Sequence, residues 1–471
     1  MTLRKILLTT TALGAAAMLA SPAFAGSAAA SQGEIDALKA QVEALTQRLD
    51  DIAIQSGNDI KEIKEKQDAV QIDFKDGKPT FRTGDGLFTM SIRGRAHLDS
   101  AIYDQKDSQT PALNSGVNFR RAEFGLEGTF MRDWGYKMNF QWGDSGNEKA
   151  STIKDLYLSY NGIKGVSIMA GAIQTFMTLD DSTSSNDITF IERSSASNLA
   201  TSLGAGDGRI SFGARGASEN FYGSLFYTTE TVGQANTSNE GSNIVARTAY
   251  RFAPTEDMNI HVGLSGTYAM DPSTNGGTNG QVRWRDRPEL RVDPTRLIDI
   301  NVTNAKSAYV AGPEFAMNYG PFKAQAEYYR YAVQRTGATD VDPAFDAWYL
   351  QGSWVITGEK YKYSMEEAAF KGVKPASPFS LGGGIGAWEL AARYSVADLN
   401  DNVNAGAVAT ANNFRGGEQK ITTIGLNWYP INNVRMMFEY IDVDMDKLAA
   451  NGVADAGESH KAYASRIQFA F

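Results

Sequence analysis

Apolar and polar side chains alternate along residues 87–103. Phe88 and Ile92 fall on one face of an extended chain, whereas Arg93 and Arg95 fall on the other. A period of two is the pattern of a β-strand, whose side chains point to opposite faces in turn. The apolar face suits either the core of a soluble sheet or the lipid around a membrane barrel, whose basic face would then line a watery lumen. The rest of the chain decides between these two structures.

The same alternation recurs in segments of roughly the length of a membrane-spanning strand, about ten residues. Sixteen such segments follow one another, at 87–103, 117–131, 133–143, 150–160, 165–173, 206–216, 219–229, 242–253, 258–269, 306–318, 321–333, 345–357, 385–397, 419–429, 433–444 and 461–471. An even number of strands, joined in turn by tight turns and long loops, is typical of bacterial outer-membrane barrels. The sequence therefore predicts an all-β fold, a 16-stranded antiparallel transmembrane β-barrel.

The connections between these segments are of two kinds. Turn-forming residues occur at Asn161-Gly162, Pro254–Asp257, Gly320-Pro321 and Pro430–Asn433, and we interpret them as tight turns. Long polar connections span 104–116, 174–205, 230–241, 270–305, 358–384, 398–418 and 445–460. We expect these long connections to be extracellular or to fold into the lumen.

Aromatic residues support the membrane barrel. In the last segment Tyr463, Ile467 and Phe469 share one face with the terminal Phe471, and such an ending resembles the signal that outer-membrane barrels present to their assembly machinery. Further aromatics near strand ends are candidates for interfacial girdles. They are Trp134, Tyr157, Trp348, Trp354, Trp388, Trp428 and Tyr429.

Residues 1–25 have the features of a signal peptide. Arg4 and Lys5 precede an apolar stretch, and Ala23-Phe24-Ala25 fits a cleavage site. A transmembrane helix is the alternative, but this apolar core is shorter than the roughly 20 residues that a bilayer requires. We therefore expect an exported protein. The absence of cysteine fits an outer-membrane protein as well as a periplasmic one.

Residues 26–75 contain a heptad pattern of apolar side chains. The pattern comprises Ile35, Leu38, Val42, Leu45, Leu49 and Ile52, and after a break at Ser56-Gly57 it resumes with Ile60, Ile63 and Val70. Alternate spacings of three and four residues form the a/d seam of a coiled coil, here with a stutter. A single amphipathic helix lying on another surface is the alternative. We favour self-association, and predict a short N-terminal α-helical coiled coil followed by a barrel domain over residues 76–471.

Composition and charge narrow the function further. The net charge of −9 becomes −11 by the same count once Arg4 and Lys5 leave with the signal peptide, and this argues against a nucleic-acid partner. The three histidines, His97, His261 and His460, lack the spacing of metal ligands. No Walker or G-x-S-x-G sequence occurs. We therefore expect no enzyme activity, no metal and no cofactor.

Two groups of arginines carry the candidate chemistry of the first strands. Arg93 and Arg95 share the predicted lumen face, and Arg120 and Arg121 are adjacent near the start of the second strand. Adjacent residues of a regular strand face opposite sides, and an arginine in lipid at the midplane costs about 2–4 kcal/mol. We therefore expect a strand end or a β-bulge that lets both side chains reach water.

A second set of arginines lies in the connection at 270–305. Arg283, Arg285 and Arg287 alternate, so in an extended segment they project from one side about 6.6–7 Å apart, and Arg291 continues the row. Guanidinium groups match the oxygens of phosphate and carboxylate, and several sites of moderate strength suit conduction. The alternative is a surface loop whose charge is neutralised by nearby acidic residues. Those residues are Asp286, Glu289 and Asp293.

With these residues in place, the sequence resembles the phosphate-selective porin O/P family of Gram-negative outer membranes. The matching stretches are GRAHLD at 94–99, FRRAEFGLEGTFMRDWGYKMNF at 119–140, TSSNDITFIER at 183–193, GSWVITGE at 352–359, GAWELAARYS at 386–395 and GLNWYP at 425–430. The resemblance implies a trimer of sixteen-stranded barrels in which a long loop folds inward and narrows each pore.

The resemblance also implies roles for individual residues. Arg95, Arg120 and Arg121 match arginines that bind the anion at the constriction of the family. The spacing of the four arginines in the 270–305 connection matches an arginine ladder that leads anions inward. Two positions depart from the pattern: Glu123 stands where phosphate-selective members have an aromatic residue, and Gln174 is not basic.

These observations lead to one expected function and two alternatives. We expect a passive, trimeric porin in the outer membrane of a Gram-negative bacterium, surrounded by lipid and lipopolysaccharide. Its arginine-lined pore should conduct small anions such as phosphate or polyphosphate. One alternative is a weakly selective general porin. The other is an envelope tether in which the coiled coil reaches peptidoglycan or another cell-wall component.

Overall fold

The structure of the chain is a computed structural model that describes residues 32–75, 77–106, 111–145, 152–233, 239–274, 279–403, 412–448 and 459–471. The chain divides into two compact units between Asp68 and Ala69. The signal peptide predicted at residues 1–25 lies outside the described residues.

The first unit is the helix α1, which spans Gln32–Asp68 without a break at Ser56-Gly57. Its heptad side chains are exposed in the single chain, Leu45 and Leu49 by 59% and 65%. The coiled coil therefore stays a prediction. No helix in the described part of the chain is long and apolar enough to cross a membrane.

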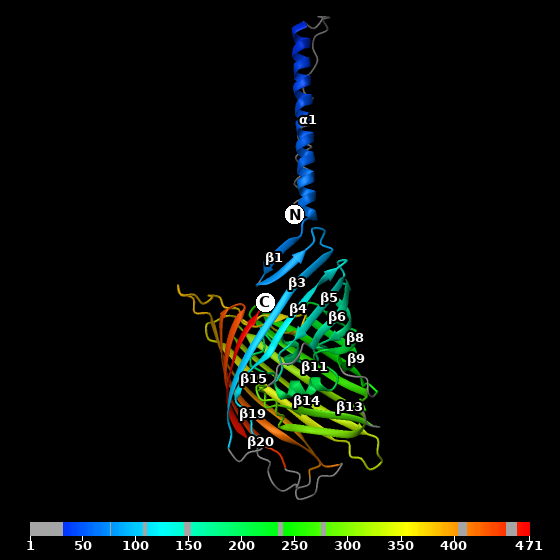
Figure 1. Ribbon diagram of the computed structural model, residues 1–471, viewed down its shortest axis with the longest axis vertical. Coiled ribbons are helices and arrows are strands. Elements are labelled where there is room, and N and C mark those ends of the chain that lie inside the picture. The colour runs from blue at the N-terminus through cyan, green and yellow to red at the C-terminus, as the bar shows by residue number, and fades with distance from the viewer. Residues whose placement is uncertain are drawn as a thin grey trace. The chain divides into compact units, whose positions relative to one another are not determined.

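The second unit contains a closed antiparallel barrel of sixteen strands, so the predicted fold class is confirmed (Figure 1). The strands are β3 (Phe88–Asp104), β4 (Gly116–Phe130), β5 (Trp134–Gln141), β6 (Thr152–Ile163), β7 (Val166–Ile173), β8 (Arg209–Ala217), β9 (Phe221–Thr231), β10 (Ser242–Thr255), β11 (Met258–Asp271), β13 (Ile298–Tyr319), β14 (Phe322–Arg335), β15 (Ala344–Val355), β18 (Ala387–Asp401), β19 (Phe414–Ile431), β20 (Val434–Asp446) and β21 (His460–Ala470). The last strand, β21, pairs with β3 and closes the ring.

Shorter elements extend or fill this barrel. The hairpin of β1 (Gln71–Lys75) and β2 (Lys78–Arg82) pairs with the start of β3. The strand β12 (Gly280–Asp286) pairs with the first part of β13. The hairpin of β16 (Tyr363–Ser364) and β17 (Ala369–Phe370) lies between β15 and β18, and α2 (Leu179–Ser182) and α3 (Ser195–Ser202) lie between β7 and β8.

The polarity of the wall is the reverse of a soluble sheet. Large apolar side chains such as Phe212 and Leu264 are about 60% exposed on the outer face, whereas Arg393 and Arg435 on the inner face are buried. An outer apolar band facing lipid and a polar interior are the pattern of an outer-membrane barrel. The alternation of apolar and polar positions in the sequence thus predicts correctly which side chains face outward and which face the lumen.

Two local expectations need correction. Tyr157 lines the interior and Tyr429 is buried with its hydroxyl on Glu389, so neither belongs to an outer aromatic girdle. Their strand positions have the parity of inward-facing residues. The turn expected at Asn161-Gly162 lies instead at Lys164-Gly165, because β6 continues to its end through an irregular register.

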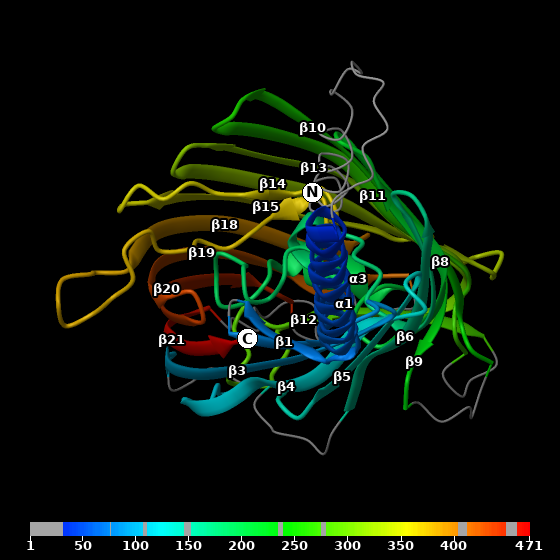
Figure 2. The same cartoon turned by 90° about the horizontal axis from the view of Figure 1, so that it is seen from above.

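Three connections fold into the lumen and form the core with the inner wall. We call residues 174–208 the lumen loop; the other two span 272–297, of which 275–278 lie outside the described residues, and 356–386. Figure 2 shows α3 and β12 within the ring of strands. The 356–386 connection starts and ends on the side of the short turns, and it packs inward because Arg247 donates to the carbonyl oxygens of Glu367 and Ala368.

One carboxylate fixes the first part of the lumen loop. Glu327 of β14 accepts hydrogen bonds from the backbone N–H groups of Leu179 and Asp180 at 2.7 and 3.0 Å. The hydroxyls of Tyr329 and Tyr349 donate to the same carboxylate at 2.8 and 2.5 Å. Unpaired backbone groups at the start of α2 thereby obtain partners, which buried polar groups require.

Cationic and amide side chains of β18 to β21 fix the second part of the loop. They donate to backbone carbonyl oxygens between residues 188 and 192. Arg435 donates to Ile188 and Thr189, and Asn427 donates to Thr189. Arg466 donates to Ile191, and Arg393 donates to Glu192. The loop is therefore held against the wall from β14 to β21.

Removing the first anchor should widen the pore. In Glu327→Ala the N–H groups of Leu179 and Asp180 lose their acceptor, and unsatisfied buried donors cost about 1–3 kcal/mol. We expect a larger and noisier single-channel conductance in planar bilayers. The matched variant Asp346→Ala removes a carboxylate paired with Arg330 on the outer face, and should conduct as the unmodified protein does. Equal conductance of all three proteins would contradict the anchoring role.

Candidate functional site: charged residues of the lumen

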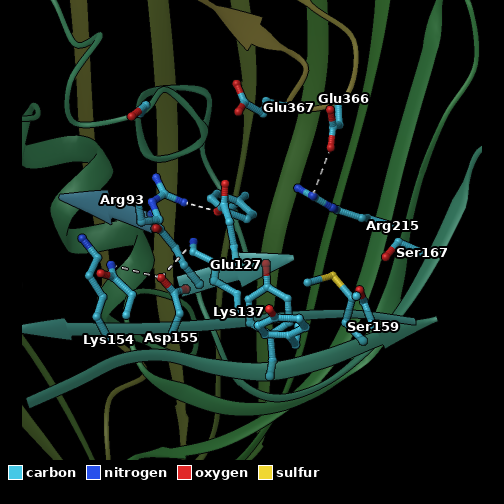
Figure 3. Close-up of a pocket in the computed structure, with 18 of the residues that line it drawn as sticks. Arg93, Glu127, Lys137, Lys154, Asp155, Ser159, Ser167, Arg215, Glu366 and Glu367 are labelled. Atoms are coloured by element: carbon cyan, nitrogen blue, oxygen red, sulfur yellow. Dashed lines mark hydrogen bonds and ion pairs between the residues drawn. The ribbon is translucent and has the colours of Figure 1, made fainter. Parts of the chain in front are cut away.

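The lumen loop leaves a space beside one part of the barrel wall. Because the loop packs against β14 to β21, a cavity of about 560 Å³ remains beside β3 to β8. Figure 3 shows side chains of this wall pointing into the cavity from below and Glu366 and Glu367 facing them from the 356–386 connection. The cavity is lined by both signs of charge: Arg93, Arg95, Lys137, Lys154, Arg193 and Arg215, and Glu127, Asp155, Asp181, Glu366 and Glu367.

Most of these cavity charges are paired. Arg93 contacts Glu127 at 2.5 Å, and Lys137 contacts Asp155 at 2.9 Å. In Figure 3 the Arg215 guanidinium points toward Glu366, and their closest atoms are 3.7 Å apart. Cationic and anionic side chains thus alternate across a water-accessible space.

The inner ends of Arg95 and Lys154 meet at Glu123. The Glu123 carboxylate lies 3.2 Å from Arg95 and 3.0 Å from Lys154, and it accepts a hydrogen bond from Asn139 at 2.9 Å. Two cations neutralise it here, so its negative charge does not stand alone in the lumen.

A cluster of arginines surrounds Glu192 of the lumen loop. Arg120 donates to both carboxylate oxygens, from Nε at 2.8 Å and from Nη2 at 3.2 Å. Arg466 donates to one oxygen at 3.1 Å, Arg291 lies 3.2 Å from the other, and Arg121 lies 3.7 Å away. We call these five residues the Glu192 cluster. It joins β4, β21, the lumen loop and the 272–297 connection.

The expected β-bulge is what brings Arg120 and Arg121 into this cluster together. In the β3–β4 ladder His97 pairs with Arg121 and Leu98 pairs with Phe119, so Arg120 has no partner residue. The extra residue shifts the register by one, and both guanidinium groups turn into the lumen, 7% and 3% exposed. This expectation is confirmed.

Positive charge exceeds negative charge around the Glu192 cluster. Three carboxylates balance its four guanidinium groups: Glu192, Asp99 and Asp286. Asp99 accepts two hydrogen bonds from Arg466, and Asp286 lies 3.9 Å from Arg291. Four cations against three anions leave one positive charge in excess. Burial alone would raise the pKa of Glu192, but the four arginines outweigh burial and hold that pKa well below its usual range, so the carboxylate is ionised.

The arginines of the 272–297 connection divide into two pairs rather than forming one row. Arg283 and Arg285 alternate with the buried Trp284 in β12 and are exposed, and Arg283 is paired with Asp299. The row predicted from Arg283 to Arg291 does not continue, because β12 ends at Asp286 and the chain then turns.

The second pair lies deeper. Arg287 is buried and donates to the carbonyl oxygen of Pro294 at 3.1 Å, whereas Arg291 reaches Glu192. Glu289, between them, has a positive φ of 54°, which marks the turn that separates the two side chains. Burial and the nearby charge of Arg291 lower the pKa of Arg287 to about 10, as expected where positive charges crowd.

The sequence alone does not identify two members of the cluster. Glu192 lies in the matching stretch 183–193, but the path of an irregular loop gives no indication of where a side chain points. Arg466 could have been found, since it lies on the inward face of the last strand, where a buried cation signals a partner. Within the described residues no group of three or more His, Asp or Glu side chains is arranged to hold a metal ion.

Comparisons with known proteins agree with the barrel. Residues 90–471 match the family described as "Phosphate-selective porin O and P". Porin O of Pseudomonas aeruginosa is 26% identical over 409 residues, which cover 83% of this chain and 90% of that protein. An uncharacterised protein of Caulobacter vibrioides is 27% identical over 377 residues, which cover 77% of this chain and 70% of that protein.

Solved structures of outer-membrane proteins show a more distant likeness. An anion-selective porin from Comamonas acidovorans is 14% identical with a TM-score of 0.49, and the match covers 82% of this chain and 100% of that one. OmpT of Vibrio cholerae is 12% identical with a TM-score of 0.48, and the match covers 82% and 98%. Because the family match spans most of the sequence, the chain belongs to the family of phosphate-selective porins O and P, in the outer membrane of a Gram-negative bacterium.

Proposed function

We propose that the protein is a passive porin whose lumen favours small anions, with phosphate and polyphosphate as candidate solutes. The observation that carries the proposal is the convergence of four guanidinium groups from three separate parts of the chain. They are Arg120 and Arg121 of β4, Arg291 of the 272–297 connection and Arg466 of β21. No cofactor is required, because the solute moves down its own gradient.

Physical chemistry explains how such groups select anions. An anion that leaves bulk water for a narrow lumen loses hydration, which is costly for a small multivalent ion. Guanidinium groups replace water with paired N–H donors whose geometry matches phosphate and carboxylate oxygens. One uncompensated positive charge in a medium of reduced dielectric then favours chloride or phosphate over potassium.

The remaining arginines suggest a path through the barrel. Arg283 and Arg285 are exposed in the 272–297 connection, on the side of the long loops. The Glu192 cluster follows, and Arg95 and Arg93 lie further along β3 toward the short turns. We propose that these positions offer successive sites of moderate strength, which conduct better than one deep site.

Reversal potentials in planar bilayers test this proposal. Under a KCl gradient we expect anion selectivity, and we expect millimolar phosphate to reduce the chloride current. Arg121→Gln should lower the chloride-to-potassium permeability ratio by about threefold to tenfold, the effect of one unit charge at close range.

The matched control is Arg330→Gln. Arg330 belongs to β14, but it is exposed on the outer face, where it pairs with Asp346. Its loss should leave the permeability ratio unchanged. Cation selectivity of the unmodified protein, or equal effects of the two substitutions, would refute a selective arginine lumen.

A weakly selective general porin is the second candidate function. It is favoured by the cavity below the Glu192 cluster, where six basic and five acidic side chains nearly cancel. In that case the reversal potential would lie near zero and phosphate would not block the chloride current.

We further propose that three chains associate, with α1 forming part of the contact. The exposed apolar seam of α1, from Ile35 to Ile63, is the area that a second and third copy would bury. Outer-membrane lipid and lipopolysaccharide would surround the remaining apolar wall. A cell-wall partner for α1, such as peptidoglycan, is the competing proposal.

Polar substitutions in the seam test the role of α1 in assembly. Leu38→Ser combined with Leu45→Ser in the full-length protein should lower the temperature at which detergent-solubilised oligomers dissociate, because burial of two leucines is worth about 3–6 kcal/mol per chain. Lys39→Ser combined with Lys61→Ser leaves the seam intact and serves as control. An unchanged dissociation temperature, together with loss of envelope integrity in cells, would favour the tether.

A further inference from the structure

Glu192 is held in place from its backbone. Arg393 donates to the Glu192 carbonyl oxygen at 3.0 Å, and the preceding N–H, of Ile191, donates to Glu439 at 2.6 Å. Arg466 donates to the Ile191 carbonyl oxygen at 2.6 Å. Since both neighbouring peptide groups are fixed, the Glu192 carboxylate moves only by rotation of its own side chain.

The surroundings of that carboxylate are those of a bound anion. Three guanidinium groups lie within 3.2 Å of its oxygens, with Arg120 in a two-point contact. The Glu192 side chain is 1% exposed. Nη1 of Arg121 is buried without a hydrogen-bond acceptor, although its guanidinium lies near Glu192. The cluster therefore has donor capacity that one carboxylate does not use.

Carboxylate and phosphate are recognised by the same guanidinium geometry. A solute anion that entered the Glu192 cluster would meet donors already engaged by the chain itself. A tethered group acts at a high effective concentration and therefore occupies the site most of the time. The apparent affinity of a free ligand is its intrinsic affinity multiplied by the fraction of time that the site is vacant.

We propose that Glu192 is a tethered competitor: its carboxylate occupies an anion site formed by Arg120, Arg121, Arg291 and Arg466, and a permeating anion enters by displacing it. This inference rests on the proposed anion conduction. Displacement weakens binding, and the return of Glu192 to the arginines helps the solute leave. Without Glu192 the excess positive charge, counted with Asp99 and Asp286, would rise from one to two, and the site would hold an anion more tightly.

Phosphate block of the chloride current provides the test. Glu192→Gln removes the charge but keeps the size of the side chain and an amide oxygen that can accept from Arg120. We expect the inorganic phosphate concentration that halves the chloride current to fall by about tenfold or more. The chloride-to-potassium permeability ratio should rise in the same variant.

Two further variants separate competition from a loosened loop. Glu327→Gln alters a wall carboxylate that binds the same loop through the N–H groups of Leu179 and Asp180 and is bonded to tyrosine hydroxyls rather than to the arginines of the cluster. This variant should leave the half-blocking phosphate concentration unchanged or raise it. Glu192→Asp keeps the charge and shortens the side chain, so its block should lie between those of the unmodified protein and Glu192→Gln. It also preserves an ion pair for folding if the glutamine variant fails to insert.

The outcomes distinguish this inference from the function on which it rests. If the unmodified protein is anion-selective but Glu192→Gln binds phosphate no more tightly, Glu192 is a structural anchor and the inference is wrong. If neither the unmodified protein nor the variant shows anion selectivity or phosphate block, the proposed anion conduction fails as well. Tighter block in Glu192→Gln, without tighter block in Glu327→Gln, supports the competitor, whereas equally tighter block in both variants would point to a loosened loop and contradict it.

Discussion

The structure depends on how an irregular loop obtains hydrogen-bond partners inside a barrel. The lumen loop has few backbone partners of its own, and its buried N–H and C=O groups would each be costly if unpaired. The inner wall supplies polar side chains for them: Glu327 and Glu439 accept from N–H groups, and Arg435 and Arg466 donate to carbonyl oxygens. The position of the loop, and hence of the open space beside it, follows from these bonds.

The same bonds determine which charges remain for a solute. Arg435 is largely occupied in holding the loop, whereas Arg120 and Arg121 face another charged side chain, Glu192. Side chains that look equivalent in sequence therefore differ in availability. In our account Glu123 is a neutralised member of the wall, because Arg95 and Lys154 compensate it, while Glu192 competes directly for the arginines.

The sequence predicts the strands of the barrel wall far better than the segments that fold into the lumen. Alternation with a period of two depends only on which face meets lipid, so it located all sixteen strands and the inward direction of Arg93 and Arg95. The bulge at Arg120 was also predictable, since the cost of an arginine in lipid excludes a regular strand there.

Most of what the sequence does not predict lies in the connections. No periodicity reports where a loop crosses a lumen, so Glu192 was not recognised as a partner of four arginines. The row from Arg283 to Arg291 assumed an extended chain, but the strand ends and the chain turns before Arg291. In β6 the place of Tyr157 along the strand suggests an aromatic girdle, but its parity indicates the lumen, and the side chain lines the cavity.

The location of anions in the lumen tests the central claim most directly. Crystals of the unmodified protein equilibrated with bromide would show anomalous scattering wherever anions bind. The account predicts bromide beside Arg121 or Arg95 inside the barrel, and near the exposed Arg283 and Arg285 at its entrance. Bromide confined to the outer surface, and absent from the lumen at bromide concentrations at which the channel conducts anions, would contradict an arginine path for anions.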